Sequence, residues 1–565
     1  MLPSLRCVLW LACTAVVSAQ TPVVTATAET MRIRSSTVAA SGAAFNVTVV
    51  MENDNANATL PATYRRWWHF QVGNLAPAGV TLNFTIDSTG GYTDIILPCW
   101  SLSTNGTTWT PYTRCPTSAT PTVSATGGRH SFSLAVPAGT SAIRLAKYFP
   151  YTVARKNAWL ASLVGRPQIR SATVLGSSVQ GRTIDMLELT DSSVPDTNKR
   201  RIWIHSGIHP SESTSYFTVE GLVDWLCTND PYAASLLDRA IVTIVPMANP
   251  DGVFLGNYRV NANSVNLEDE WAAPYNSSQP EIIALRSKIE QFMGTAAAPA
   301  QNPIEVLLNL HSSHNIAYPF HFQHASNAAW TAGATGVLPI VNQKEGQWIA
   351  MFKARSPFVN RGATQSSTAG FPSRPFVESM SHDRWTAVNG WLNAPNFEQP
   401  VMAITFEGTY GRGPDGVTWN TEADYRLCGQ ELGLSLCDFF GVVPGASVTP
   451  YGASCQSVSL SGALGPAGIN QSLTLTTMNA APNALLILAI GGQQIQVPLP
   501  APWSSCNALT TLDANFVFFA NALGVATLPL VIPPSPGLAG YLQVGALDAA
   551  GGLDASNGLY LRNDY

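Results

Sequence analysis

A histidine and a glutamate three residues apart, His209 and Glu212, follow an apolar strand-like segment and precede a helical stretch. At a turn between a strand and a helix, this spacing can aim an imidazole and a carboxylate at one point. Two such side chains are two of the three protein ligands that a catalytic zinc ion needs, with a fourth position left for water. A third ligand must come from another segment, and His311 directly follows the apolar run EVLLNL. The residue types and their contexts therefore predict a zinc centre.

The central part of the chain has the pattern needed to position such a centre. Between about residues 158 and 441, apolar strand segments alternate with helical segments such as 215–226 and 281–293. This alternation predicts an α/β domain whose buried strands bring functional groups together at their carboxyl ends. We therefore expect His209 and His311 to meet at one edge of the sheet.

The flanking segments have a different pattern. Short strands with a two-residue period, separated by turn residues, occupy residues 23–155 and predict a β-sandwich. After a Pro-Gly linker the chain returns to short strands and predicts a second, smaller β domain. The predicted order is a signal peptide (1–19), an N-terminal β-sandwich (20–157), a catalytic α/β domain (158–443) and a C-terminal β domain (444–565).

Composition excludes some classes of function. Charged residues make up 12% of the chain, and 30 Lys and Arg stand against 35 Asp and Glu, for a net charge of −5. No basic excess is present to displace phosphate counterions, so nucleic acid is not an expected partner. A hydrophobic content of 46% excludes a largely disordered chain.

The first nineteen residues predict the compartment. Arg6 precedes an apolar run that ends in the small residues Val17-Ser18-Ala19, as in a secretory signal peptide. The run is too short to span a bilayer, so we expect a secreted, extracellular or periplasmic protein without a transmembrane segment. Lipid attachment at Cys13 is the less favoured alternative, because the apolar run continues past that residue.

Cysteine positions agree with an oxidising compartment. The chain has 9 cysteines, of which the signal peptide holds two. Two local disulfides are expected, Cys99–Cys115 and Cys455–Cys506. Three cysteines remain: Cys227, Cys428 and Cys437. One disulfide between two of them is possible, and the third thiol must then stay free within the chain.

Several motifs in this order resemble the zinc carboxypeptidase family, and most closely its cytosolic carboxypeptidase subfamily. The motifs are IHPSE (208–212), IVPMANPDGVFLGNYR (244–259), LHSSH (310–314), ITFEGTYG (404–411) and, before the α/β domain, YFPYTVARKNAWL (148–160). The resemblance covers about residues 40–441 and leaves the last 120 or so residues outside it.

The resemblance implies roles for individual residues. It implies that His209, Glu212 and His311 hold one zinc ion per chain, whose bound water attacks a peptide carbonyl. It further implies that Glu407 is the general base and that Arg259 binds substrate and stabilises the oxyanion. No ligand role is implied for His205 or His314, and His321 and His324 are expected to be loop histidines. The expected substrate is a peptide or protein.

One segment departs from the family pattern. Where relatives have an Asn-Arg pair that binds the terminal carboxylate of the substrate, this chain has Glu268 and Asp269. Three interpretations follow: a substrate with a cation at that subsite, a neutral substrate cut by an endopeptidase or amidase, or a zinc-binding protein without catalysis. The third is disfavoured because Glu407 and Arg259 remain. The alternative to all three is an acidic turn exposed to solvent.

Three classes of function therefore stay open. The leading one is a secreted zinc metallopeptidase of the carboxypeptidase type with an atypical acidic subsite at Glu268 and Asp269. The others are an amidase, endopeptidase or ester hydrolase that uses the same zinc site, and a non-catalytic extracellular binding protein. For the C-terminal domain, attachment to a cell surface or matrix and simple stabilisation of the chain are both open.

Overall fold

The computed structural model divides the chain into two compact bodies. It describes residues 20–89, 94–124, 128–271, 278–295, 297–313, 321–323, 339–360, 377–381, 384–385, 401–413, 415–442, 446–465, 471–533 and 538–563. The first body comprises the described residues of 1–189, 195–223 and 241–432, and the second those of 190–194, 224–240 and 433–565. The predicted signal peptide, His314, His324 and linker residues 443–445 lie outside the described residues.

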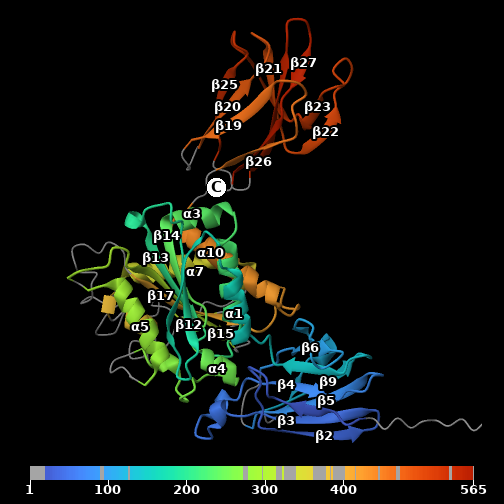
Figure 1. Ribbon diagram of the computed structural model, residues 1–565, viewed down its shortest axis with the longest axis vertical. Coiled ribbons are helices and arrows are strands. Elements are labelled where there is room, and N and C mark those ends of the chain that lie inside the picture. The colour runs from blue at the N-terminus through green and yellow to red at the C-terminus, as the bar shows by residue number, and fades with distance from the viewer. Residues whose placement is uncertain are drawn as a thin grey trace, which may run out of the picture. The chain divides into compact units, whose positions relative to one another are not determined.

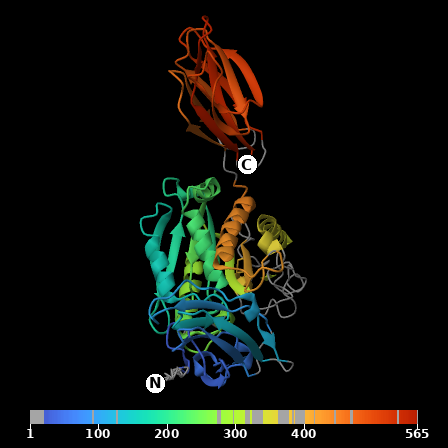
Figure 2. The ribbon, with the colours of Figure 1, turned by 90° about the vertical axis from the view of Figure 1, so that its right-hand side faces the viewer.

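Two five-stranded sheets form the N-terminal part of the first body (blue in Figures 1 and 2). One has the order β1 (Val23–Thr25), β4 (His69–Gly73), β10 (Ala142–Ala146), β6 (Cys99–Ser103) and β7 (Thr113–Arg114). The other has the order β2 (Ser35–Ser41), β3 (Ala44–Val50), β5 (Val80–Asp87), β9 (Arg129–Val136) and β8 (Thr122–Val123). Residues of β9 alternate between exposed and buried, as expected for a strand with one face on the core.

The core of this sandwich is aromatic and extends into the rest of the body. The rings of Phe84 and Phe132 stack with centroids 5.1 Å apart. The same cluster of buried residues includes Tyr258, Tyr410 and Trp419 from beyond the sandwich. The N-terminal strands therefore share one hydrophobic core with the segments around the predicted site.

A seven-stranded mixed sheet forms the centre of the first body. Its order is β11 (Ile169–Ser177), β12 (Thr183–Leu189), β14 (Ala240–Val245), β13 (Arg200–Ser206), β15 (Ile304–Ser313), β17 (Met402–Thr409) and β16 (His321–Gln323). Strands β13, β15 and β17 run parallel to one another, so their carboxyl ends meet at one edge. Both faces are covered by helices (Figure 1), which agrees with the predicted α/β class.

The helices pack on this sheet through apolar and small residues. They are α1 (Val153–Ser162), α2 (Thr214–Leu226), α4 (Pro250–Leu255), α5 (Pro280–Met293), α7 (Pro339–Arg355), α8 (Pro357–Asn360), α9 (Val377–Ser381) and α10 (Glu422–Phe439). Leu285 and Ile289 of α5 lie in one buried cluster with Trp203 of β13. A Cβ atom at Gly221 of α2 would lie 1.9 Å from the carbonyl oxygen of Arg426, so the close approach of α2 and α10 requires glycine there.

The second body is mainly antiparallel β structure. One sheet contains β18 (Ser447–Tyr451), β28 (Gly558–Asn563), β26 (Leu538–Leu547), β21 (Leu485–Gly491) and β24 (Ala514–Phe519), with β27 (Leu553–Ala555) beside β26. Smaller sheets contain β19 (Ser459–Leu464), β20 (Ser472–Met478) and β25 (Ala526–Val531), and β22 (Gln494–Pro498) with β23 (Asn507–Thr510). Helix α3 (Pro231–Arg239) also belongs to this body.

The predicted cysteine pairing is half correct. The disulfide Cys455–Cys506 is present and closes a loop of 51 residues, which confirms that prediction. The prediction of Cys99–Cys115 is wrong, because both are buried free thiols. Cys99 pairs with Arg114 across the β6–β7 ladder, so Cys115 is one residue out of register and its side chain leaves from the opposite face. The three remaining cysteines are also buried, and within the described residues none of them forms a disulfide: Cys227, Cys428 and Cys437.

Among the helices of the described residues, none combines the length and apolar character that crossing a bilayer requires. The residue bounds predicted for the three domains stay a prediction.

Candidate active site

Three neighbouring strands bring the predicted site residues to one edge of the central sheet. His311 lies near the end of β15 and pairs in register with Glu407 of β17. On the other side of β15, Ser206 ends β13 opposite Leu310, and His209 follows three residues later. The predicted convergence of strand ends therefore positions an imidazole from each of two strands and a carboxylate from the third.

The turn after β13 has a conformation that depends on Gly207. This residue has φ 75°, and a Cβ atom there would lie 2.4 Å from the ring of Tyr216. The hydroxyl of Tyr216 donates a hydrogen bond to the carbonyl of Pro210 at 2.9 Å, which ties α2 to the turn. His209 and Glu212 consequently leave the turn on the same side.

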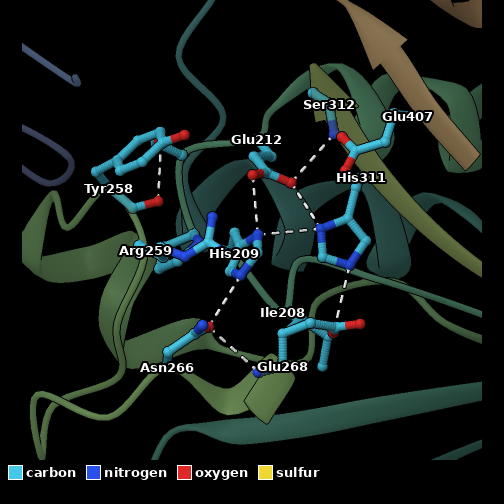
Figure 3. Close-up of polar contacts among 12 residues, drawn as sticks. Ile208, His209, Glu212, Tyr258, Arg259, Asn266, Glu268, His311, Ser312 and Glu407 are labelled. Carbon is cyan, nitrogen blue, oxygen red and sulfur yellow. Dashed lines mark hydrogen bonds and ion pairs between the residues drawn. The ribbon is translucent and has the colours of Figure 1, made fainter. Parts of the chain in front are cut away.

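The side chains of His209, Glu212 and His311 form one buried donor set (Figure 3). The two oxygens of Glu212 lie 2.9 Å from Nδ1 of His209 and 2.8 Å from Nδ1 of His311, and the two Nδ1 atoms are 3.1 Å apart. A single proton cannot satisfy all of these atoms, whereas a cation between them can. Two imidazole nitrogens and a carboxylate are also the ligands that zinc prefers, so the residues fit this ion.

The outer nitrogens of both histidines face acceptors. Nε2 of His209 is 3.0 Å from the side-chain oxygen of Asn266, and Nε2 of His311 is 3.5 Å from a carboxylate oxygen of Glu268. With Nδ1 used for metal, Nε2 carries the proton: that of His209 donates to Asn266, and that of His311 faces Glu268 as an ion pair. Such contacts fix the ring orientation and the tautomer of a metal-ligating histidine.

Glu407 is the carboxyl group expected to act as a base. Burial, and then the charge of Glu212, raise its pKa to about 8. Nε2 of His321 lies 3.9 Å from Glu407, because His321 pairs with it across the β16–β17 ladder. The expectation that His321 is a loop residue is therefore wrong, since it lies in a short edge strand beside the site.

Arg259 approaches the donor set from the segment that follows α4. Burial, and then the nearby positive charge of Arg259, lower the pKa of His209. The charge of Arg259 also lowers the pKa of Glu407. Figure 3 shows its side chain beside His209. A guanidinium at this position can donate to an oxygen that becomes negative during attack on a carbonyl.

Comparison with known proteins agrees with this geometry. Residues 156–266 match the family model of the zinc carboxypeptidases. This stretch of the chain is therefore similar to a zinc carboxypeptidase domain. The match includes His209, Glu212 and Arg259, and the resemblance predicted from the motifs is confirmed. The family and the fold support a hydrolase with a zinc cofactor.

Cytosolic carboxypeptidases are among the similar curated proteins. Cytosolic carboxypeptidase 6 of Caenorhabditis elegans is 33% identical over 174 residues, which is 30% of this chain and 37% of that protein. The human protein of the same name is 34% identical over 146 residues, 25% of this chain and 29% of that protein. The chain thus matches well under half the length of these relatives.

Solved structures share the fold over a longer stretch. A metallo-carboxypeptidase from Pseudomonas aeruginosa has a TM-score of 0.58 at 22% identity and covers 74% of this chain and 99% of its own. One from Burkholderia cenocepacia has a TM-score of 0.57 at 20% identity with the same coverage. The predicted α/β fold of the zinc carboxypeptidase domain is confirmed.

The two acids at the atypical subsite lie in different surroundings. Glu268 is buried, and its Oε1 accepts a hydrogen bond from the side-chain amide of Asn309 at 3.0 Å. Asp269 is exposed and accepts one from the side-chain amide of Asn266 at 2.7 Å. Only Glu268 therefore faces the buried side of the site.

A third acid near this subsite was not predicted. Glu378 of α9 is fully buried, and burial, then the charge of Glu268, raise its pKa to about 8. No motif contains Glu378, so its place could not be predicted from sequence spacing.

His205 lies outside the donor set: its Nδ1 accepts a hydrogen bond from the indole of Trp203 at 3.0 Å, and burial lowers its pKa to about 3.

Proposed function

We propose that this chain is a secreted zinc-dependent metallopeptidase of the carboxypeptidase type with an acidic substrate subsite. The observation that supports it best is the meeting of His209 Nδ1, Glu212 and His311 Nδ1, with all ligand atoms within 4.8 Å of one another. Glu407 on the adjacent strand and Arg259 on the other side supply the groups that hydrolysis needs beyond the metal.

The residues of this chain have separate tasks in the proposed reaction. When bound, zinc supplies a Lewis acid that lowers the pKa of water and polarises a carbonyl. Glu407 takes up the proton of the attacking water and returns it to the leaving amine, which requires a pKa near the working pH. A pKa raised by burial meets that requirement. Arg259 donates to the oxyanion, and Glu268 and Asn266 hold the histidine rings.

Charge around the site favours a cationic or uncharged substrate group. Four carboxyl groups and one guanidinium surround His311 among the described residues: Glu212, Glu268, Glu378, Glu407 and Arg259. Because the pKa values of Glu378 and Glu407 are raised to about 8 and that of Glu268 is lowered, Glu268 is the ionised acid of the subsite near neutral pH. A free terminal carboxylate beside the ionised Glu268 is repelled, whereas an ammonium or guanidinium group is attracted. We propose Glu268 and Glu378 as the buried acids of the subsite and Asp269 as an acid at its rim.

An amidase or endopeptidase that takes neutral substrates is the second candidate. It is favoured by the contacts of Glu268, whose oxygens face Asn309 and His311. A carboxylate engaged in this way orients the metal ligand His311 and does not select the substrate. The two candidates differ in what Glu268 contacts during catalysis, so they give different results with charged and neutral peptides.

Secretion is also a proposal. The disulfide Cys455–Cys506 supports it, because structural disulfides persist in oxidising compartments. Mass spectrometry of the protein from the culture medium or periplasm should show an N-terminus near residue 20, whereas an intact leader on a cytosolic protein would contradict secretion. For the C-terminal β domain we propose attachment to a cell surface or matrix, with stabilisation of the chain as the alternative.

Zinc analysis combined with peptide hydrolysis tests the proposed function. The wild-type protein should contain one zinc per chain and hydrolyse peptides with a cationic or amidated group at the subsite faster than free acids. Replacing Glu268 by Asn and Asp269 by Arg should shift this ratio of kcat/KM values toward free acids. Full zinc without hydrolysis of any peptide, amide or ester would refute the proposal and leave a binding protein.

A further inference from the structure

A buried aspartate of the N-terminal part contacts the segment that contains Arg259. Asp54 belongs to a short 3-10 helix (Asp54–Ala56) and is 1% exposed. Its Oδ1 accepts a hydrogen bond from the backbone N–H of Tyr258 at 2.7 Å. Its Oδ2 accepts from the backbone N–H groups of Arg259 at 2.7 Å and Val260 at 3.0 Å. One carboxylate therefore binds three successive peptide groups more than two hundred residues away.

These contacts determine the path of a segment that has no regular structure of its own. Helix α4 ends at Leu255, and Gly256 follows in the left-handed region with φ 68°. No strand or helix is assigned from there to Leu267 in the described chain. The backbone N–H groups of residues 258–260 thus have no ladder or helix partner, and Asp54 takes that place.

Neighbouring residues of the N-terminal part contact the same segment. The side-chain amide of Asn55 donates to the carbonyl of Asn261 at 2.8 Å and to Ser264 Oγ at 3.0 Å. The ring of Tyr64 lies 5.6 Å from Cζ of Arg259, which places an aromatic face against the guanidinium. Both the backbone and the side chain of Arg259 are therefore held from outside the α/β domain.

We infer that Asp54 is a positioning residue for Arg259, and that the N-terminal β part thereby completes the active site. The inference rests on the proposed function for the catalytic task of Arg259. Asp54 itself touches no reacting atom. Its contribution is to fix the backbone from which the guanidinium projects, so that the donors are in place before the oxyanion forms.

The substitution Asp54→Asn tests this role with little change in volume. An Asn side chain retains one acceptor oxygen and places an NH₂ group against peptide N–H groups, so at least one of the three contacts is lost. We expect kcat to fall by about 10- to 100-fold, since loss of a whole oxyanion donor costs about 10²–10³-fold. Zinc content should be unchanged and KM should change less than about threefold.

A double-mutant cycle separates positioning from general stability. Arg259→Ala removes the guanidinium, and in that background Asp54→Asn should reduce kcat by less than about threefold. Tyr151→Phe is the matched control. It removes a buried hydrogen bond of 2.8 Å between the N-terminal part and Glu220 of α2, away from Arg259, and should leave kcat unchanged.

Hydrogen exchange gives a readout that does not need turnover. In the zinc-loaded protein, Asp54→Asn should speed amide exchange at residues 258–260, whereas Tyr151→Phe should not. Faster exchange in a protein without hydrolytic activity would refute the proposed function and retain the positioning of Arg259. Unchanged exchange would overturn the inference.

Two further outcomes would overturn it. Equal losses of kcat from Asp54→Asn with and without Arg259 would show that Asp54 acts through the fold alone. If Asp54→Asn is insoluble, Asp54→Ser, which keeps one acceptor and adds no opposing NH₂, should fold and show the same loss of kcat. Insolubility of both variants beside a soluble Tyr151→Phe protein would assign Asp54 to stability.

Discussion

Glu268→Gln is the substitution that best separates the roles open to the atypical subsite. The wild-type carboxylate faces two donors, the amide of Asn309 at 3.0 Å and Nε2 of His311 at 3.5 Å. A glutamine has one oxygen and one NH₂ group. Either orientation therefore leaves a donor facing a donor and removes the negative charge, while side-chain volume is nearly constant.

The geometry sets the size of two separate effects. A substrate cation about 4 Å from Glu268 would gain about 4 kcal/mol at an effective dielectric of about 20 and about 1 kcal/mol at about 80. Glu268 is 4% exposed, which favours the lower dielectric, and desolvation of the cation offsets part of the gain. We therefore expect a shift of about 10- to 100-fold in substrate preference. Loss of the partner that contacts Nε2 of the zinc ligand His311 should also weaken zinc binding by about 10- to 100-fold.

Two assays on the same protein measure these effects. Competition with a chelator gives the Kd of zinc, and saturating zinc then allows kcat/KM to be compared between a cationic or amidated peptide and its free acid. Glu268→Gln should raise the Kd and move the kcat/KM ratio toward the free acid. Glu270→Gln, which removes the same charge two residues later, should change neither value by more than about twofold.

The results distinguish the competing interpretations. A raised Kd with an unchanged ratio would refute substrate reading by Glu268 and leave it as a partner of His311. A changed ratio with an unchanged Kd would refute the proposed contact to the metal ligand. No change in either value would contradict the electrostatic reasoning as a whole and would leave Glu268 without a role in zinc binding or substrate selection.

The remaining predictions concern the metal, the base and the C-terminal body. His311→Ala should lose stoichiometric zinc by metal analysis, while His205→Ala should keep it. Full zinc in the His311→Ala variant would show that β15 does not supply a metal ligand. Glu407→Gln should retain zinc and lose about 10²–10⁴-fold in kcat, and equal activity would assign the base elsewhere. A chain ending at residue 442 should fold and hydrolyse small substrates, and an inactive or insoluble product would show that the C-terminal body completes the catalytic unit.

The sequence was sufficient for the features that local patterns encode. Alternating apolar segments predicted the central sheet, and the order of the motifs predicted the zinc carboxypeptidase family. The meeting of His209 and His311 followed from one rule, that parallel strands present their carboxyl ends at a common edge. The structure brings these two residues together as predicted.

Features that depend on register or on distant segments could not be predicted. The prediction of a Cys99–Cys115 disulfide failed because spacing along the chain does not indicate on which face of a strand a side chain lies. The position of His321 opposite Glu407 depends on pairing between two strands separated by 78 residues or more. Glu378 reaches the site through a short helix with no motif of its own.

Buried carboxylates in this molecule serve two different purposes. Glu220 is paired with the guanidinium groups of Arg155 and Arg426, and these ion pairs join α2 to α1 and α10. Asp54 and Glu268 are also buried, but their partners include peptide N–H groups, a side-chain amide and an imidazole. A buried charge is costly unless such donors compensate it. Breaking one of these contacts would leave part of the charge uncompensated, which favours keeping each donor in place. The buried carboxylates of Asp54 and Glu268 thereby help to fix the positions of Arg259 and His311.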